Sequence, residues 1–224
     1  MVTQEIRKLR ESLRDRLIDT ALSLFSRYGF HATGIDTILA ETGVAKMTLY
    51  KNFASKDELI LAALERQGAE FRDWLTERVN VSRRAPRDRL LAAFTAVGEW
   101  CANPQYTGFI FVNAAAEFHR ADDPIHLAAS RQKRWIQDFL CASATESGAH
   151  NPESLASQLC VLMDGAFTLT HISGSTEPVR QAAAAARILI DGALAKTDMR
   201  PSRQIRPSRQ IRKRVLKSPR RAVS

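Results

Sequence analysis

The sequence predicts an all-α protein, and three observations support this fold class. Apolar residues recur at spacings of three and four through most of the chain, which is the period of an amphipathic helix. A capping residue or a proline precedes most of these segments, as is typical of helix starts. No stretch alternates polar and apolar residues over the length of a strand. We therefore expect helices packed on helices and no sheet.

The first predicted helix spans residues 5–29. Leu13 and Leu17 belong to an apolar stripe that continues to Phe25 at helical spacing, while charged residues fall mainly off the stripe. Gly29 ends the helix, because glycine readily takes the left-handed conformation found just past helix ends.

A compact run from Thr33 to Phe53 predicts two short helices around one glycine. Thr33 and Asp36 resemble a capping box for the first of them. Gly43 supplies the left-handed conformation that a tight turn needs. The second short helix buries Leu49 and Phe53. Two short helices around such a turn have the outline of a helix-turn-helix.

Six further helices are predicted after this run. Ser55 and Glu58 form a capping box for a long helix that ends near Val79. Prolines open most of the later helices, at the position where a missing N–H costs nothing. The remaining predicted ranges are 86–102, 106–120, 124–147, 152–173 and 178–196.

The positive charge of the chain is concentrated at its C-terminal end. The formal net charge is +9, but residues 199–224 hold ten basic residues and no acidic one, so residues 1–198 carry −1. A six-residue segment, Arg200–Ile205, is repeated verbatim directly after itself. Such an arginine-rich, proline-containing segment cannot bury enough apolar surface to offset its ordering entropy, so we predict a disordered tail over 199–224. The overall basicity alone therefore does not predict nucleic-acid binding.

Several classes of protein are excluded by what the sequence lacks. No apolar run approaches the roughly 20 residues that span a bilayer, and the first residues lack a secretory signal, so we expect a cytoplasmic protein with no membrane partner. No phosphate loop, nucleophile elbow or zinc motif is present, so we expect no enzyme, no metal and no cofactor. Cys101, Cys141 and Cys160 have no metal-ligand spacing. They are interpreted as buried apolar residues, with a redox sensor as the alternative.

The helix-turn-helix segment carries a family pattern. Gly43-Val44, Thr48-Leu49-Tyr50, Phe53 and the run Ser55 to Leu59 resemble the N-terminal domain of the TetR/AcrR family of transcription regulators. The resemblance is close over roughly the first 60 residues, and beyond them it is one of helix number and length. Ala45 departs from it, because the family commonly has a phosphate-binding serine there. The resemblance implies a sequence-specific regulator, usually a repressor that a small molecule releases from DNA.

The second short helix suits the major groove of double-stranded DNA, where base edges present a readable pattern. Lys46 can reach guanine or a phosphate, and Met47 and Thr48 can contact a thymine methyl group. The alternative is that Tyr50 covers the small domain's core and the lysines form a solvated face. The predicted DNA-binding residues are Thr33, Lys46, Met47, Thr48, Tyr50, Lys51 and Lys56.

We expect a DNA-binding domain over 1–56, a ligand-binding and dimerisation domain over 57–198, and the tail over 199–224. The resemblance implies a small-molecule pocket in the second domain and a homodimer formed by the last two helices, which would read a palindromic operator. Candidate pocket residues are aromatic, or polar within apolar helices: Trp100, Phe109, Phe111, Asn113, Glu117, Phe118, His119, Trp135, Phe139, Phe167 and His171. Candidate dimer residues are Leu155, Leu159, Leu162, Ile188 and Leu189.

A sequence-nonspecific DNA-binding protein driven by the basic tail is the alternative function. Such binding depends on counterion release from phosphates and weakens steeply with salt. Removing residues 199–224 separates the two hypotheses, since only the nonspecific binder would lose its affinity.

Overall fold

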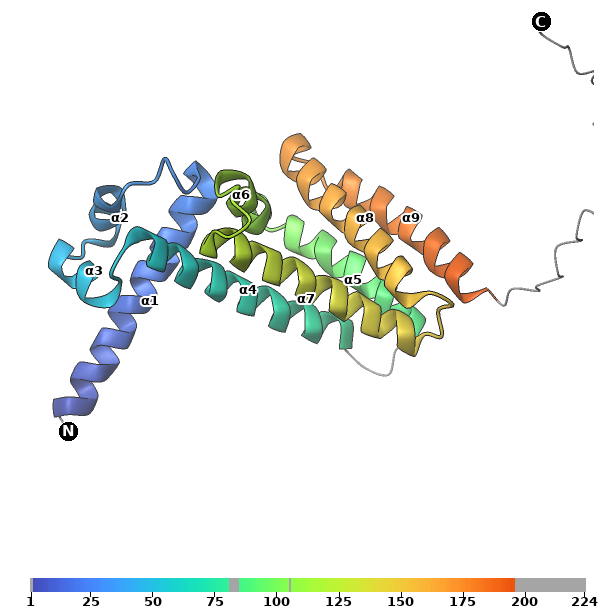
Figure 1. The fold of residues 1–224 in the computed structure, drawn as a ribbon, viewed down its shortest axis with the longest axis horizontal. Coiled ribbons are helices and arrows are strands. Elements are labelled where there is room, and N and C mark those ends of the chain that lie inside the picture. Colours follow the sequence, from blue (N-terminus) through green and yellow to red (C-terminus); the bar gives the residue numbers. More distant parts are fainter. Residues whose placement is uncertain (1, 81–84, 105, 196–224) are drawn as a thin grey trace, which may run out of the picture. The chain divides into compact units, whose positions relative to one another are not determined.

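The computed structural model describes residues 2–80, 85–104 and 106–195 (Figure 1). Within these ranges the chain forms α-helices and no strand, which confirms the predicted fold class. The predicted tail, 199–224, lies outside the described residues. The helices are α1 (Val2–Tyr28), α2 (Ile35–Thr42), α3 (Lys46–Asn52), α4 (Lys56–Asn80), α5 (Pro86–Cys101), α6 (Ile110–Glu117), α7 (Pro124–Glu146), α8 (Pro152–Ser173) and α9 (Glu177–Leu194).

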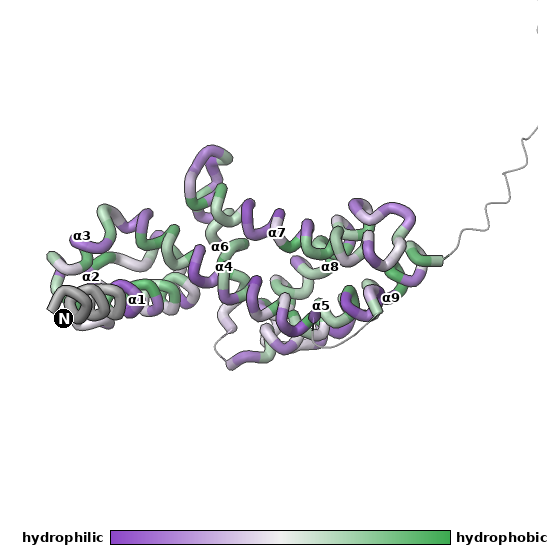
Figure 2. The backbone as a smooth tube through the Cα atoms, turned by 90° about the horizontal axis from the view of Figure 1, so that it is seen from below, coloured by the Kyte–Doolittle hydropathy of each residue, from purple (hydrophilic) through white to green (hydrophobic). Residues whose placement is uncertain are grey.

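The chain through Leu194 packs as one compact unit. Helix α4 contacts α1 on one side and both α5 and α7 further along its length, so it joins the helix-turn-helix to the remaining helices. Polar and apolar residues alternate along the helices in Figure 2, as amphipathic packing requires. Because the contacts are continuous through Leu194, the division at residue 56 stays a prediction.

Helices α2 and α3 meet at the predicted glycine turn. Gly43 has φ +65°, and its N–H donates to the Leu39 carbonyl at 2.9 Å. A residue with a side chain is strained at this angle, so the turn depends on the glycine. Ile38 and Leu49 are fully buried beneath the turn and hold the two helices against α1.

The capping box predicted for Thr33 is wrong. Helix α2 begins at Ile35 with Gly34 as its N-cap, and no side chain caps it. The Thr33 hydroxyl is buried and donates instead to the Gly29 carbonyl at 2.7 Å, near the end of α1. Thr33 therefore satisfies the last carbonyls of one helix rather than the first N–H groups of the next.

The capping box at the start of α4 is confirmed, with one difference. The Glu58 N–H donates to Ser55 Oγ at 3.1 Å, as the pattern requires. The Glu58 carboxylate reaches back to the N–H of Ala54 at 2.6 Å, one residue further than in the standard box.

The helices after α4 enclose an aromatic core centred on Phe71. Its ring makes edge contacts with Trp100, Phe109 and Phe167 at centroid distances of 5.1, 5.4 and 6.1 Å. Phe109 and Phe167 are themselves stacked at 4.4 Å. Edge-to-face and offset arrangements at these distances are the favourable ones for aromatic pairs, so this cluster ties α4, α5, α6 and α8 together.

Helix α6 is shorter than the helix predicted over 106–120. It starts at Ile110, because Gly108 has φ +98° and breaks the helical path before it. A Cβ atom at Gly108 would lie 3.2 Å from the His171 ring of α8, so this segment passes too close to α8 for a larger residue. At the other end, Phe118 has left the helical conformation.

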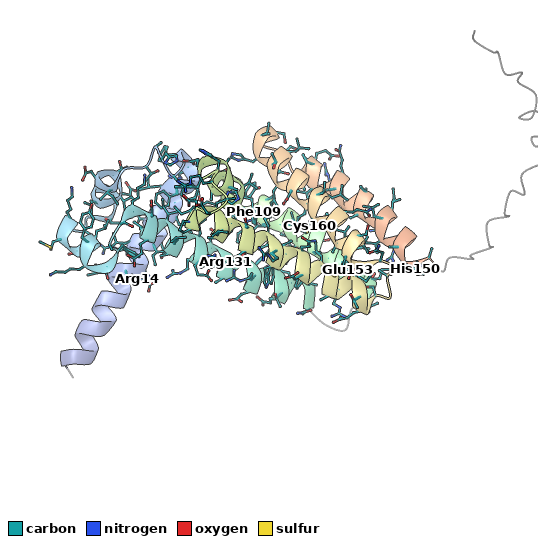
Figure 3. The ribbon with its side chains drawn as sticks, in the orientation of Figure 1. Arg14, Phe109, Arg131, His150, Glu153 and Cys160 are labelled. Carbon is teal, nitrogen blue, oxygen red and sulfur yellow. The ribbon has the colours of Figure 1, made fainter. Side chains whose placement is uncertain are left out.

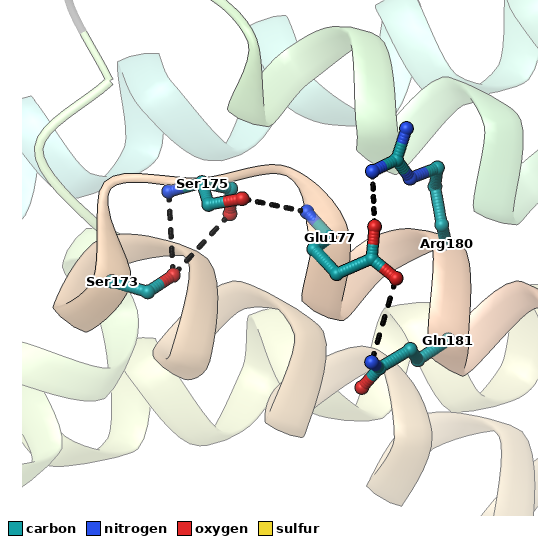
Figure 4. A network of polar contacts seen from close by, with 5 residues as sticks. All are labelled: Ser173, Ser175, Glu177, Arg180 and Gln181. Atoms are coloured by element: carbon teal, nitrogen blue, oxygen red, sulfur yellow. Dashed lines mark hydrogen bonds and ion pairs between the residues drawn. The ribbon is translucent and has the colours of Figure 1, made fainter.

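Helices α8 and α9 are connected by a hydrogen-bonded turn (Figure 4). Gly174 ends α8 with φ +65°. Ser175 accepts the N–H of Glu177 at 3.2 Å, and the Glu177 carboxylate accepts from Arg180 and from Gln181. These bonds satisfy groups at the start of α9 that would otherwise lack partners.

Among the described helices, α8 has the length and apolar composition of a membrane span. It packs extensively against α7 and α9, and Leu155, Leu159, Met163 and Phe167 are buried within the unit. A buried helix of a helical bundle has the same composition, so we interpret α8 as a core helix.

We predict that Ser55→Ala lowers the free energy of unfolding by about 1 kcal/mol, because it removes the N-cap acceptor of α4. Chemical denaturation followed by circular dichroism measures this change. Ser154→Ala is the matched control, since the cap of α8 is supplied by Asn151 instead. Equal losses for the two variants would contradict the capping role of Ser55.

Candidate DNA interface and internal cavities

Helix α3 presents a polar and amphipathic face to solvent and an apolar face to the core. Met47 and Tyr50 are 69% and 47% exposed, and Lys46 and Lys51 are exposed beside them. Leu49, on the opposite face, is fully buried. Thr48 is half-buried between the two faces. The outward face thus combines cations, a hydroxyl, an aromatic ring and a thioether, which are groups that contact phosphates, base edges and thymine methyls.

Lys46 forms a weak ion pair within the chain, which leaves its ammonium group available to DNA. Its ammonium lies 3.5 Å from the Asp36 carboxylate of α2, and both side chains are largely exposed. Ion pairs of this kind contribute little, about 0–1 kcal/mol. A phosphate or a guanine edge can therefore compete with Asp36 for the lysine.

Lys56 and Thr33 were both predicted to contact DNA at the edges of this surface, and the structure places them differently. Lys56, at the start of α4, is half-buried, and its ammonium donates to the His31 carbonyl at 3.5 Å. It lies at a helix N-terminus, as the prediction required. The side chain of Thr33 is buried and hydrogen-bonded to Gly29, so it cannot contact DNA, and this part of the prediction is wrong.

Two arginines of α1 that the sequence analysis left off the apolar stripe hold the helix-turn-helix in place. Arg16 donates to the Thr42 carbonyl at 2.7 Å and so satisfies the C-terminal end of α2. The Arg14 guanidinium lies 4.9 Å from the centre of the Phe53 ring, just after α3 (Figure 3). These are positioning contacts, and because Arg14 and Arg16 are two residues apart they reach from different sides of α1.

A cavity of about 370 Å³ lies among α1, α4, the end of α5 and the segment leading into α6; we call it the α1–α4 cavity. Two predicted pocket residues, Trp100 and Phe109, line it, and Figure 3 labels Phe109 at the start of α6. Most of its polar lining was missed by the sequence analysis, which assigned α1 to the helix-turn-helix alone. The missed residues are Asp19, Ser23, Ser26, Arg27, Gln67, Glu70, Asn103, Tyr106 and Thr107.

The missed residues do have a sequence signal. Asp19, Ser23 and Ser26 are spaced by four and three residues, as are the members of a single helix face. Gln67 and Glu70 repeat the pattern on α4. Two polar stripes facing each other would have predicted a polar cavity, whereas each stripe alone looks like a solvated surface.

The carboxylates of this cavity have different environments. Asp19 accepts a hydrogen bond from Arg66 at 2.9 Å. Burial raises the pKa of Glu70, the neighbouring Arg66 opposes this, and the negative charge of Asp19 adds to it. Within the described part of the chain, the Glu70 carboxylate has no hydrogen-bond or ion-pair partner.

Two further cavities lie against α7. The α6–α7 cavity, of about 420 Å³, has Phe111, Val112 and Ala115 on one side and Lys133 and Arg134 on the other. The α4–α7 cavity has a volume of about 200 Å³, and Phe111 and Trp135 are among the residues that line it. The predicted pocket residues Phe111 and Trp135 are thus in cavity walls.

The other predicted pocket residues lie outside the three cavities. Phe167 is fully buried beneath Phe109, and Phe139 stacks on Trp135 at 5.3 Å. His171 is exposed on α8, with its ring against Gly108. Asn113 is half-buried on α6, and His119 is exposed after it.

Glu117 was predicted as a polar pocket residue, but its carboxylate is directed at the helix-turn-helix. It accepts the N–H groups of Phe30 and His31 at 2.9 and 2.7 Å, in the turn between α1 and α2. The Phe118 ring contacts His31 and Phe30 at centroid distances of 4.8 and 5.8 Å. The end of α6 is therefore attached to the helix-turn-helix by two charge-assisted hydrogen bonds and an aromatic contact.

Two of the five residues predicted to form the dimer interface lie inside the subunit. Leu155 and Leu159 are buried inside the subunit, so their side chains cannot form a surface. Leu162 and Leu189 are half-buried, and Ile188 is 73% exposed. The periodicity of α8 located its apolar face but not the neighbour that covers it. Leu169, which belongs to the apolar stripe predicted for this helix, is 54% exposed, and the exposed apolar residues that the sequence analysis missed are Val161 and Ile172, with 72% and 74% exposure.

The three cysteines are free thiols. Burial raises the pKa of Cys101 to about 11, against the opposing effect of a hydrogen bond with Tyr106. Burial likewise raises the pKa of Cys160 to about 11, with Asp164 adding to the shift and Lys133 opposing it. A thiol with a raised pKa holds little thiolate at neutral pH, which disfavours the redox-sensor alternative for these two residues.

Comparison with known families matches both parts of the chain. The family model described as bacterial regulatory proteins, tetR family, matches residues 17–63. The model described as tetracyclin repressor-like, C-terminal domain, matches residues 86–186. The first of these covers the second half of α1, α2, α3 and the start of α4, and the second covers α5 to α8 and the first half of α9.

Individual relatives and solved structures agree with these matches. The HTH-type transcriptional repressor NemR of Escherichia coli is 28% identical over 186 residues, which cover 79% of this chain and 93% of NemR. The HTH-type transcriptional activator FasR of Mycolicibacterium smegmatis is 44% identical over 57 residues, which cover 25% of this chain and 26% of FasR. SCO4454, a TetR-family transcriptional regulator from Streptomyces coelicolor, superposes with a TM-score of 0.78 at 27% identity, covering 82% of this chain and 97% of that structure.

We predict that Cys101 and Cys160 react slowly with iodoacetamide at pH 7.5, because their raised pKa values leave little thiolate. The measurement is the labelling rate of a Cys141→Ser variant, native and in guanidinium chloride, by mass spectrometry. The native rate should be lower by about tenfold or more. Equal rates in the two conditions would contradict the assignment of both thiols as inert.

Proposed function

This chain belongs to the tetR family of bacterial regulatory proteins, and we propose that it is a repressor that binds a specific operator as a homodimer and is released by a small molecule. As a member of this family, the chain is a DNA-binding regulator of transcription. Its place of action would then be the cytoplasm, where the chromosome lies. The target sequence, the mode of assembly and the release mechanism are the proposal.

The outward face of α3 is the observation that carries the DNA-binding role. Its buried face fixes the helix through Leu49, while Lys46, Met47 and Tyr50 project from the surface. A helix held in this way can enter the major groove, with Lys46 and Met47 reading base edges and Tyr50 and Lys51 contacting phosphates. Lys56, at the start of α4, would add a phosphate contact at a helix N-terminus.

The exposed apolar residues of α8 and α9 support a homodimer. Val161, Leu169 and Ile172 of α8 and Ile188 of α9 are large apolar side chains in solvent. Covering them with the same face of a second copy would bury them and give a two-fold symmetric pair, which matches a palindromic operator.

Helix α6 connects the cavities, in which a small molecule would bind, to the helix-turn-helix. Its first residue, Ile110, lines the α1–α4 cavity, and Phe111 lines the two cavities on the other sides. Its last residue, Glu117, binds the turn before α2. A molecule that prefers a shifted α6 would move the helix-turn-helix with it, and only such a difference in affinity between two states can produce release.

We predict that Tyr50→Ala weakens binding to operator and random DNA together, while Met47→Ala reduces the preference for the operator over random DNA. Fluorescence anisotropy at near-physiological salt measures both, with the DNA adjacent to the gene and a scrambled control. Tyr28→Ala is the matched control, because Tyr28 is an exposed tyrosine at the end of α1.

The same assay on a chain lacking residues 199–224 tests the alternative function. A preference of about a thousandfold that survives the deletion establishes a specific regulator. Loss of all binding on deletion would instead establish a nonspecific binder driven by the basic tail.

We predict that Glu117→Gln loosens the turn between α1 and α2, because an amide oxygen without charge is a weaker acceptor for the two N–H groups. Hydrogen exchange followed by mass spectrometry should show faster exchange of the Phe30 and His31 amides. Glu77→Gln is the control, since Glu77 is an exposed carboxylate on α4. Unchanged exchange in Glu117→Gln would remove α6 from the release mechanism.

A further inference from the structure

We propose that the α1–α4 cavity binds a small organic cation with an aromatic or other apolar body. The inference deepens the proposed function, because it rests on that function for the regulatory meaning of the ligand. The binding itself follows from three features of the cavity: a fixed aromatic wall, an unpaired carboxylate opposite it, and a charge opposite to that of the neighbouring α6–α7 cavity.

The aromatic wall of the cavity is held in place by the core. The Trp100 ring packs edge-on against Phe71 at 5.1 Å, and Phe109 is stacked on Phe167 at 4.4 Å. The Tyr106 hydroxyl donates to the Phe167 carbonyl at 3.0 Å, which fixes the third ring. Such a preformed wall binds an apolar body at little conformational cost.

The opposite side of the cavity carries the negative charge. Arg66 bridges Asp15 and Asp19 of α1, so one arginine is shared by two carboxylates. Glu70, next to them on α4, has no ion-pair partner among the described residues, and burial disfavours its ionised form. The charged side chains that line the cavity are Asp19, Glu70 and Arg27, so the charge of the lining sums to −1. A bound cation would neutralise this excess and restore a partner to Glu70.

The lining also offers uncharged hydrogen-bond acceptors. The side chains of Ser23, Ser26 and Thr107 line the same space. Hydroxyl oxygens accept bonds from an ammonium group, which brings three donors and no acceptor. A primary or secondary ammonium therefore suits the cavity better than a quaternary one.

The neighbouring α6–α7 cavity provides an internal contrast. Its walls are largely apolar, its charged lining residues are Lys133 and Arg134, and no carboxylate lines it. An organic anion would prefer that cavity and a cation the α1–α4 cavity. The charges of the two linings therefore favour an organic cation in the α1–α4 cavity and disfavour it in the α6–α7 cavity.

A cation in the α1–α4 cavity would lie between the helix-turn-helix and the rest of the unit. Asp19 belongs to α1, Glu70 to α4, and Thr107 to the segment that leads into α6. A ligand attracted to both carboxylates would change the balance of forces between α1 and α4 directly. This position is suited to an effector, because α1 and α4 flank the DNA-binding surface.

The experiment compares three probes with one carbon skeleton on the full chain: 2-phenylethylammonium, the neutral 2-phenylethanol and the anion phenylacetate. Isothermal titration calorimetry gives the affinities at pH 7.5. The indole N–H resonances of the three tryptophans report location, since Trp100 lines the proposed cavity and Trp135 the α4–α7 cavity. We expect saturable binding of the ammonium probe with a shift of the Trp100 signal and none of Trp135.

Two carboxylate variants test the charge requirement. Glu70→Gln keeps the shape of the side chain and should weaken binding of the ammonium probe by about two- to fivefold, as expected for a partly exposed ion pair. Glu77→Gln, at an exposed carboxylate of α4 that does not line the cavity, should leave the affinity unchanged. Ser26→Lys, which places a cation in the cavity, should abolish binding while the other resonances confirm an intact fold.

Several results would overturn the proposal. These are no binding of the ammonium probe, equal binding of 2-phenylethanol, tighter binding of phenylacetate, or equal effects of Glu70→Gln and Glu77→Gln. The outcome is independent of the DNA-binding assay. Cation binding without operator preference would reject the regulatory function and keep the ligand class, and the reverse result would reject the ligand class alone.

Discussion

Helix α4 is buried along two separate stretches of its length, and the rest of the structure depends on this constraint. Leu59 and Ile60 are fully buried at its start, Phe71 and Leu75 are fully buried in the aromatic core further along, and the helix also packs on α1. One rigid helix therefore belongs to both cores. Gly68 permits this, because a Cβ there would lie 3.0 Å from the Gln132 side chain of α7 and 3.4 Å from the Phe111 ring of α6. Any rotation of α4 in one core must displace the other, since close-packed interiors do not absorb such shifts.

Local chemistry made most helix boundaries predictable from the sequence. The box at Ser55, the glycine at position 43 and the cap at Asp123 act within a few residues of themselves, and each is present in the structure. The errors arise where a distant segment decides. Thr33 has the right spacing for a cap, but its hydroxyl finds a carbonyl of α1. The chain before α6 is non-helical because α8 lies against Gly108.

The candidate site was only partly predictable, for a related reason. Helical periodicity identifies an apolar face but does not identify what covers it, so Leu155 was assigned to a dimer surface although it is buried in the subunit. It also does not show which polar stripes face each other, which is why Asp19 and Glu70 were not assigned to a cavity. Residues whose environment is set by their own helix, such as Met47 and Leu49 on α3, were oriented correctly. A cavity, by contrast, is a property of several helices at once.

The energetics of α6 explain why a weakly binding molecule could act on this chain. Cavities border the buried Ile110 and Phe111, so a molecule bound in one of them would contact this end of the helix directly. The other end is attached to the helix-turn-helix by the two hydrogen bonds of Glu117 and by the contacts of the Phe118 ring with Phe30 and His31. Bonds to a charged acceptor contribute about 1.5–3 kcal/mol each, so weakening one of them changes a two-state equilibrium by roughly tenfold to a hundredfold. That is the usual size of an allosteric coupling free energy, about 1–3 kcal/mol. A ligand needs only this difference in affinity between the two positions of α6, and its total affinity can remain modest.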